Sequence, residues 1–135
     1  MWTLILCGEH HSADYWTTDE SCKLAALCVQ ALCTFHDCSS ISQLLLGRSQ
    51  DLSPSFKQAL VILRPKLLQS TWRKHPGAIA SYKWLLTQLC SPNLSEYLDI
   101  VSPTALIIID DHDVNRRLLG LQCLSHIINN VVSRS

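Results

Sequence analysis

Residues 110–131, "DDHDVNRRLLGLQCLSHIINNV", place a cluster of charges directly before a long apolar pattern. Asp113 is a good helix N-cap, because its carboxylate can accept hydrogen bonds from the first backbone amides. Residues 114–132 then carry apolar side chains at helical spacing, and more than one side of the helix is apolar. The sequence therefore predicts a helix packed between neighbours, with a buried face formed by Leu121, Leu124, Ile128 and Val131.

Arg117 falls in the same sector of this predicted helix as the apolar side chains. A buried guanidinium needs a partner, because an unpaired charge is costly to remove from water. Asp110 and Asp111, just before the helix, are the nearest acids. We therefore expect an inter-helix charge pair between Asp111 and Arg117.

The opposite side of the same helix carries polar residues without formal charge. Such a stripe is either a neutral solvent-facing surface or part of a protein-contact surface, since ordinary solvent faces usually carry Lys and Glu. Its members are Asn115, Gln122, His126, Asn129 and Ser133.

The segment 16–35, "WTTDESCKLAALCVQALCTF", predicts another helix. Thr17 and Glu20 have the spacing of a capping box. The apolar side chains behind them recur every three or four residues and predict a buried face. That face comprises Leu24, Leu27, Cys28, Ala31, Leu32 and Phe35.

Three Ser-Pro pairs, at 53–54, 91–92 and 102–103, each resemble a helix start with a hydroxyl cap and a proline in the first turn. The first two begin similar stretches 38 residues apart. The similarity indicates either a helical repeat of about 40 residues or two unrelated helices that begin with the same type of N-cap sequence. Pro65 should end or kink the helix that follows Pro54. The run "TALIIID" fits a strand or a buried helix, and its neighbours favour the helix.

A helix is also expected after Pro76, with a buried face formed by Ala78, Tyr82, Leu85, Leu86 and Leu89 and with Trp84 pointing away. A short helix that ends near Gly47 is also expected, and the expected number of helices in the whole chain is six or seven. The sequence thus predicts an all-α protein of stacked helical pairs.

With 135 residues, 47% of them hydrophobic, the chain can bury one sizeable core. No apolar run is long enough for a membrane span, and no signal peptide is visible, so we expect a soluble intracellular protein with reduced cysteines. The formal net charge of zero gives no simple electrostatic reason for nucleic-acid binding.

Three sharper site hypotheses can be set against these structural explanations. Cys33, His36 and Cys38, with Cys28 nearby, could hold zinc, but no paired CxxC supports it; Cys7, His10 and His11 are weaker still. Asp110–Asp113 could perform acid–base chemistry, although a cap and an ion pair explain these residues better.

The stretch 64–75 holds Arg64, Lys66, Trp72, Arg73, Lys74 and His75 and could touch nucleic acid, but a solvated face is favoured. We therefore expect no metal, no cofactor and no catalysis.

A short helix, a turn with an aspartate, and a helix with an early arginine together resemble a HEAT repeat, in which such charged residues bridge successive repeats. Asp111 and Arg117 match them, Gly120 and Leu124 match core positions, and Arg116 stands where the repeat usually has valine. More specifically, residues 16–33 and "LSEYLDIVSPTALIIIDDHDVNRRLLGLQCLSHIINNV" resemble the Tel-two-interacting (Tti-two) family of the Triple-T (TTT) complex.

This resemblance spans about residues 16–132, whereas residues 1–15 match poorly. It implies that residues 16–135 form a single HEAT-like domain, a HEAT/armadillo-like α-solenoid. Family members are much longer, so the chain is expected to be a fragment or a short isoform. The resemblance implies a non-enzymatic adaptor, cytoplasmic and nuclear, whose partners are the other TTT subunits. With chaperones, these proteins mature and stabilise phosphatidylinositol-3-kinase-related kinases (PIKKs) that act in DNA-damage and growth signalling.

Overall fold

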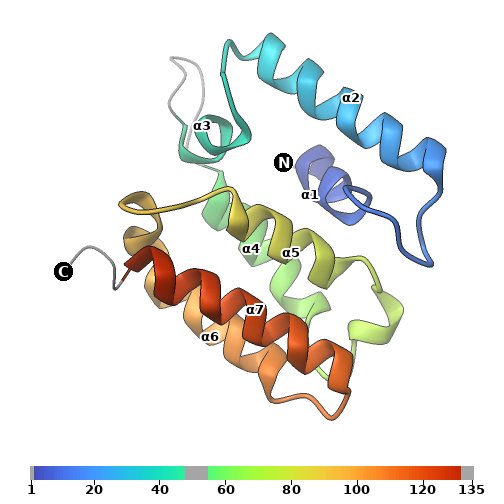
Figure 1. Cartoon of the computed structure of the whole chain (residues 1–135), viewed down its shortest axis with the longest axis vertical. Coiled ribbons are helices and arrows are strands. Elements are labelled where there is room, and N and C mark those ends of the chain that lie inside the picture. Colours follow the sequence, from blue (N-terminus) through green and yellow to red (C-terminus); the bar gives the residue numbers. More distant parts are fainter. Residues whose placement is uncertain (1, 48–54, 132–135) are drawn as a thin grey trace.

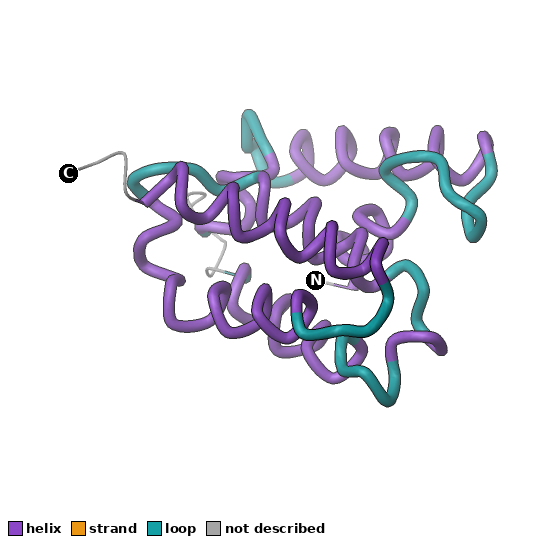
Figure 2. The backbone as a smooth tube through the Cα atoms, turned by 60° about the horizontal axis from the view of Figure 1, so that its bottom comes forward, coloured by secondary structure: helices purple, strands orange, loops and turns teal. Residues whose placement is uncertain are grey.

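A computed structural model describes residues 2–47 and 55–131, and it contains helices and loops without a strand in that part of the chain (Figure 2). The predicted all-α class is confirmed. Seven α-helices and three short 3-10 helices are present among these residues: α1 Trp2–Glu9, α2 Asp19–Phe35, α3 Ile41–Leu46, α4 Phe56–Leu63, η1 Arg64–Lys66, η2 Trp72–Lys74, α5 Ala78–Thr87, η3 Asn93–Tyr97, α6 Leu98–Ile109 and α7 Val114–Val131.

The helices are stacked in layers (Figure 1). Helix α2 lies at one end and packs against α1, and α1 packs against α5. Helix α5 then contacts both α4 and α7, and α7 runs alongside α6 at the other end. The main core therefore lies around α5, while α2 has neighbours on only one side.

Helix α5 carries the face that the sequence predicts. Ala78, Tyr82, Leu85, Leu86 and Leu89 are all buried, whereas Trp84 is only half-buried. The hydroxyl of Tyr82 donates a hydrogen bond to the carbonyl of Val101, 2.9 Å away in α6. This bond satisfies the one polar group that the ring takes into the core.

Helix α1 approaches α5 closely because Gly8 has no side chain. A Cβ atom there would lie 2.7 Å from Oγ of Ser81 and 2.9 Å from its Cα. The Ser81 hydroxyl donates to the carbonyl of Ile5 at 2.7 Å. Residues 2–9 are thus joined to the core by both packing and a buried hydrogen bond.

The segment with three consecutive isoleucines is helical, as the sequence predicts, and belongs to α6. Its start is different: Pro103 lies inside α6, so Ser102 and Pro103 do not begin a helix. Helix α7 approaches α6 at Gly120, where a Cβ atom would lie 2.8 Å from Cγ1 of Ile109.

Other helix starts also differ from the prediction. The N-cap of α2 is Thr18, whose side chain accepts from the amide of Ser21, so the capping box is one residue later than Thr17 and Glu20. Ser91 and Pro92 precede the 3-10 helix η3, whereas the matching stretch after residue 54 is the α-helix α4, so the two stretches are not equivalent. Ser53 and Pro54 lie outside the described residues. Helix α4 ends before Pro65, as predicted.

Candidate functional site

A buried ion pair joins the turn before α7 to the first turn of that helix. Nε of Arg116 lies 2.9 Å from Oδ2 of Asp111, and the two side chains are 4% and 5% exposed. Burial lowers the pKa of Arg116, and the charge of Asp111 opposes this shift. The pair therefore opposes the loss of charge from Arg116 inside an otherwise apolar layer.

The sequence predicted Arg117 as the partner of Asp111, and this prediction is wrong. Arg117 is exposed, and the buried guanidinium belongs to Arg116. The buried residues of α7 are Arg116, Gly120, Cys123 and Ile127, so the helix is rotated by about one residue relative to the predicted face. Leu121 and Ile128, which were expected in the core, are about half exposed.

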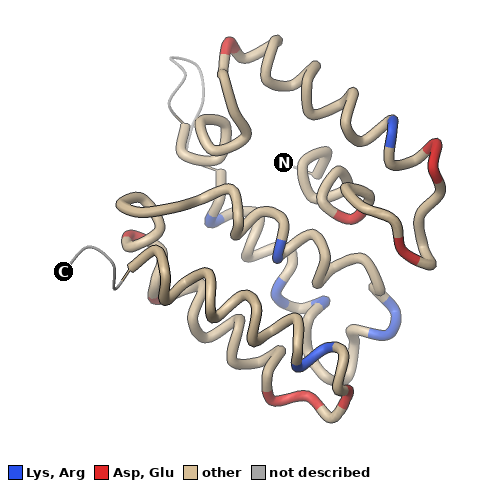
Figure 3. The backbone as a smooth tube through the Cα atoms, viewed as in Figure 1, with Lys and Arg blue, Asp and Glu red and all other residues tan. Residues whose placement is uncertain are grey.

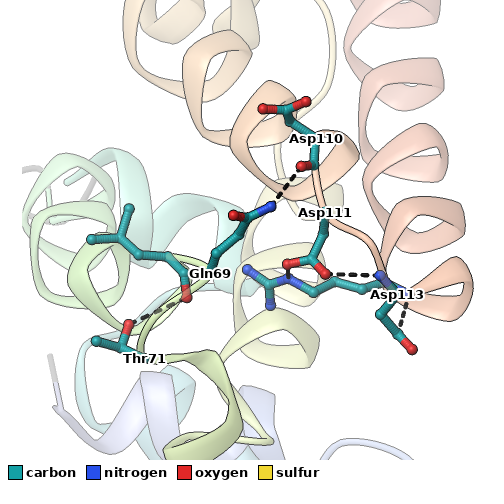
Figure 4. Close-up of polar contacts among 7 residues, drawn as sticks. Gln69, Thr71, Asp110, Asp111 and Asp113 are labelled. Carbon is teal, nitrogen blue, oxygen red and sulfur yellow. Dashed lines mark hydrogen bonds and ion pairs between the residues drawn. The ribbon is translucent and has the colours of Figure 1, made fainter.

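Backbone hydrogen bonds fix the geometry of this turn (Figure 4). The carboxylate of Asp111 also accepts from the amide of Asp113 at 2.9 Å. Oδ2 of Asp113 accepts from the amide of Arg116 at 2.9 Å, which confirms Asp113 as the cap of α7. Gln69, from the loop after η1, donates to the carbonyl of Asp110 at 2.8 Å. The carboxylates of Asp111 and Asp113 thus stabilise the turn and the start of α7.

The predicted polar stripe of α7 is partly engaged within the chain. Gln122 accepts a hydrogen bond from Nζ of Lys83 in α5. Nε2 of His126 lies 2.8 Å from the carbonyl oxygen of Leu89. Asn115 and Asn129 are exposed, and Ser133 lies outside the described residues. At the centre of the stripe, Gln122 and His126 therefore join α7 to α5 and the residues just after it. Asn115 and Asn129, on either side, are exposed to solvent.

A surface that the sequence assigned to the core is instead exposed on α2. We call it the α2 surface; it comprises Leu24, Leu27, Cys28, Ala31 and Phe35. Leu24, Leu27 and Phe35 are 61%, 60% and 83% exposed, and Leu32 alone of the predicted face is half-buried. Ala25 is the one residue of α2 that is buried. Exposed apolar residues contiguous on one helix face are typical of a protein-interaction site.

A groove of about 220 Å³ extends the α2 surface toward α1. It is lined by Leu6 and Cys7 from α1 and by Leu24 and Cys28 from α2, among others. Leu6 is itself exposed. Helices α1 and α2 therefore present a joint apolar surface that could receive a helix.

Helix α7 shows a second exposed apolar stripe at the other end of the stack. The stripe follows helical spacing and comprises Val114, Leu118, Leu121 and Ile128. No Asp, Glu, Lys or Arg occurs from residue 118 to 131. In Figure 3 the charges gather at helix ends and loops, and long parts of α2 and α7 carry none. Both ends of the stack are thus apolar.

The metal hypothesis finds no support in the geometry: residues 2–47 and 55–131 contain no group of three His, Cys, Asp or Glu side chains placed to hold an ion. Within the zinc candidates, Sγ of Cys38 contacts the carbonyl of His36 at 3.5 Å. All seven cysteines are free. Burial raises the pKa of the Cys7 thiol to about 11, which keeps it protonated at neutral pH.

Along the backbone of the basic stretch 64–75, the Lys and Arg residues lie in two separate groups, at 64–66 and at 73–74 (Figure 3). Nζ of Lys66 lies 5.3 Å from the ring centroid of Trp2, and Cζ of Arg73 lies 5.4 Å from that of Trp72. These cations are thus placed over aromatic rings of the chain itself. No described helix is long and apolar enough to cross a membrane.

The fold defines a class of protein, the all-α helical stack, and this one exposes apolar side chains on α2 and on α7. The model of the Tti2 family matches residues 4–135, and the chain belongs to that family. The match includes most of residues 1–15, and α1 within that segment is part of the structural core.

Three curated relatives are each named TELO2-interacting protein 2. The chain is 34% identical to the Rattus norvegicus protein over 129 residues, 33% identical to the Mus musculus protein over 119, and 32% identical to the Homo sapiens protein over 122. The aligned parts cover 96%, 88% and 90% of this chain. The chain spans about a quarter of the length of these relatives, with 25%, 23% and 24% covered. No solved structure matches it.

Proposed function

We propose that this chain is a non-enzymatic scaffold that binds protein partners through the α2 surface, as a subunit of a TTT complex. Membership of the Tti2 family supports this role, as does the name of the relatives, TELO2-interacting protein 2. The observation that carries the proposal is the exposure of Leu24, Leu27 and Phe35 on a helix with one buried residue.

The physical basis is the unfavourable exposure of these side chains. Covering a Leu or Phe side chain contributes roughly 1.5–3 kcal/mol to association before the costs of ordering are subtracted. The groove between α1 and α2 adds Leu6 and Cys7 to the apolar area. An amphipathic helix of the partner fits such a surface, because its apolar side chains recur every three or four residues like those of α2.

The wider role that we propose is the one implied by the resemblance to the family. The complex would use this chain to hold its subunits together while chaperones mature and stabilise PIKK kinases. That work would take place in the cytoplasm and the nucleus, in DNA-damage and growth signalling. The chain itself would contribute binding surface, without a cofactor and without turnover.

Co-purification with TELO2 and the remaining TTT subunits tests the binding site. The double variant Leu24→Glu/Leu27→Glu should reduce recovery of the partners at least ten-fold, because it places two charges on the α2 surface. Val61→Glu is the matched control, since Val61 is a 63% exposed apolar residue of α4, outside the α2 surface. Equal recovery with both variants would exclude the α2 surface, and no recovery with the unchanged chain would exclude the proposal.

A cellular experiment tests the wider role. Cells depleted of their own Tti2-family protein should lose PIKK kinases. The chain should restore kinase levels, and the Leu24→Glu/Leu27→Glu variant should not. Fluorescence imaging of the tagged chain gives its distribution between cytoplasm and nucleus. Unchanged kinase levels on addition of the chain would argue against this part of the proposal.

A further inference from the structure

A cavity of about 400 Å³ lies where three segments distant in sequence meet: the loop after α1, the residues around η2, and the first turns of α7. Tyr15, Trp16 and Trp72 give it an aromatic wall, and Ile79 and Leu119 give it an aliphatic one. Tyr15 is 81% exposed, so the cavity is open to solvent on that side. Its volume is sufficient for one long side chain that enters from outside.

Tyr15 and Trp16 form a corner of two aromatic rings. The ring planes are inclined by 84° to each other, and the ring centroids lie 5.0 Å apart. Nε1 of Trp16 donates to the carbonyl of Glu9 at 2.7 Å, and this bond fixes the indole to the end of α1. The faces of such rings carry partial negative charge and attract a cation, most strongly in the case of indole. The corner therefore favours a positively charged ligand group.

Two carboxylates from different segments, Asp14 and Asp113, also line the cavity. Oδ1 of Asp14 accepts from the amide of Tyr15 at 2.8 Å, and Oδ2 of Asp113 accepts from the amide of Arg116 at 2.9 Å. These bonds hold the carboxylates in place without neutralising them. Neither carboxylate forms an ion pair with another residue in the described part of the chain. Both negative charges are therefore available to a ligand.

The cation that already belongs to the lining does not cancel these charges. Arg116 is 4% exposed, and its Nε lies 2.9 Å from Oδ2 of Asp111, so its charge is balanced locally. Its Cζ lies 4.9 Å from the ring centroid of Trp72, which means that this ring already has a cation beside it. The corner of Tyr15 and Trp16 is thus the aromatic surface left for a ligand. The two lining carboxylates repel an anion there and attract a cation.

The shape of the cavity selects among cations. A compact ammonium group fits between two rings set at a right angle, whereas a planar guanidinium stacks flat on one ring. The aliphatic wall suits the four-carbon stem of lysine, because this side chain packs its stem on apolar surface and carries its charge at the end. The open side leaves room for the main chain to which the stem is attached.

We infer that this cavity binds the side chain of a lysine that a partner protein presents. The ammonium group lies at the corner of Tyr15 and Trp16 and donates to the carboxylates of Asp14 and Asp113, while the stem packs on the aliphatic wall. The site is separate from the α2 surface and stands whether or not that surface binds TTT subunits.

N-acetyl-lysine N-methylamide is the probe, and three residues with the same caps are its controls: norleucine (uncharged), glutamate (anionic) and arginine (a planar cation). The indole N–H resonances of the full chain report binding, because Trp16 and Trp72 line the cavity while Trp2 and Trp84 do not. Titrations at pH 8 keep an ordinary imidazole neutral, so that His75, which also lines the cavity, adds no charge. The lysine probe should shift Trp16 with saturation. Its Kd should be at least ten-fold lower than those of norleucine and glutamate, and lower than that of arginine.

Free L-lysine distinguishes a lysine of a protein from the free amino acid. Its main-chain carboxylate would lie on the open side of the cavity, near the exposed Asp14, and would be repelled there. Its Kd should therefore be at least three-fold higher than that of the capped lysine probe.

Asp14→Asn removes one of the two charges at an exposed position and should weaken binding of the lysine probe at least five-fold. Asp99→Asn is the matched control, because Asp99 is an exposed acid of α6 that does not line the cavity. Three results would each overturn the assignment: no saturable shift of Trp16, a control probe or free lysine that binds as tightly as the capped lysine, or equal binding by the two variants.

Discussion

Arg116 and Asp111 form an ion pair across the turn between α6 and α7, with Nε and Oδ2 2.9 Å apart and both side chains almost fully buried. The two residues are five positions apart in sequence, so the pair closes the turn directly. Such a pair contributes less to net stability than its geometry suggests, because both charges were removed from water. Removal of one partner alone is strongly destabilising, because the other charge then remains buried without a partner.

Arg116→Ala should therefore lower the free energy of unfolding by about 3–5 kcal/mol. Urea denaturation followed by circular dichroism measures this change. Arg117→Ala is the matched control: Arg117 is exposed, so its removal should change stability by less than about 0.5 kcal/mol. A larger loss for Arg117→Ala than for Arg116→Ala would contradict the observed pairing.

Gly120→Ala should destabilise the protein, although alanine favours helices by about 1 kcal/mol over glycine. The added Cβ would lie 2.8 Å from Cγ1 of Ile109 and 2.9 Å from its backbone nitrogen, which cannot move freely. We expect a net loss of about 1–2 kcal/mol in urea denaturation, because overpacking costs exceed the gain in propensity. Ser125→Ala, at an exposed position of the same helix, should be nearly neutral. A more stable Gly120→Ala protein would mean that α6 and α7 are not so close.

Two leucine substitutions test whether the α2 surface is separate from the core. Leu85→Ala should cost about 2–5 kcal/mol, because Leu85 is fully buried in α5. Leu27→Ala should cost less than about 0.5 kcal/mol, since Leu27 is exposed on α2. Both values come from the same denaturation experiment on the isolated chain. Similar losses for the two variants would show that α2 is packed more fully than the structure has it.

Thiol alkylation provides an independent map of the same surface. Iodoacetamide near pH 8 should modify the exposed Cys28 and Cys90 first and the buried Cys7, Cys38 and Cys123 last. Mass spectrometry of timed samples gives the order. If the proposed TTT partners cover the α2 surface, their addition should slow modification of Cys28, on that surface, but not of Cys90. Protection of Cys90 alone would place the partner elsewhere.

Alkaline pH should destabilise the fold through two buried thiols. Burial raises the pKa of Cys7 to about 11 and that of Cys123 to about 12, from a usual value near 9. The folded state then holds protons that the unfolded state releases, so this stability is fully present below pH 9 and is lost as pH rises toward 11–12. The expected slope is about 1.4 kcal/mol per pH unit for each thiol. Cys123→Ala should flatten the slope between pH 9 and 11; an unchanged slope would contradict the contribution of Cys123.

The helices were predictable where one face alone is apolar. In α5 the spacing from Ala78 to Leu89 determines the buried side, whereas Trp84, which was expected to point away, is half-buried and packs against the core. Asp113 was predictable as a cap because few side chains can satisfy free amides at a helix start. These features depend on residues close in sequence, so local rules suffice.

The register of α7 was not predictable from local rules. Arg116 and Arg117 are adjacent and differ by only about 100° around the helix, and apolar residues cover most of its circumference. Contact with α6 at Gly120 selects which arginine is buried, and that contact depends on the turn geometry. Two consecutive arginines beside an apolar stripe were the only local signal, and they fit either register.

The α2 surface was missed for a different reason. A helical apolar stripe predicts burial but does not say whether the covering atoms belong to the same chain. Leu24 and Phe35 have the pattern of core residues and the exposure of surface residues. A cavity of about 400 Å³ next to Arg116 was not predictable either, because Tyr15, Trp72 and Asn115, which line it, are too far apart in sequence to suggest a common site.

Cells that make this chain in excess of its partners leave Leu24, Leu27 and Phe35 in contact with water. Quality-control chaperones and proteases act on surfaces of this kind, so unassembled copies should be degraded sooner than assembled ones. When a partner binds and covers α2, chaperones and proteases can no longer reach these side chains, and the fraction of protected copies rises with the partner concentration by mass action. The cellular abundance of the protein should therefore follow the supply of its partners, and matched subunit amounts would arise without a dedicated regulator.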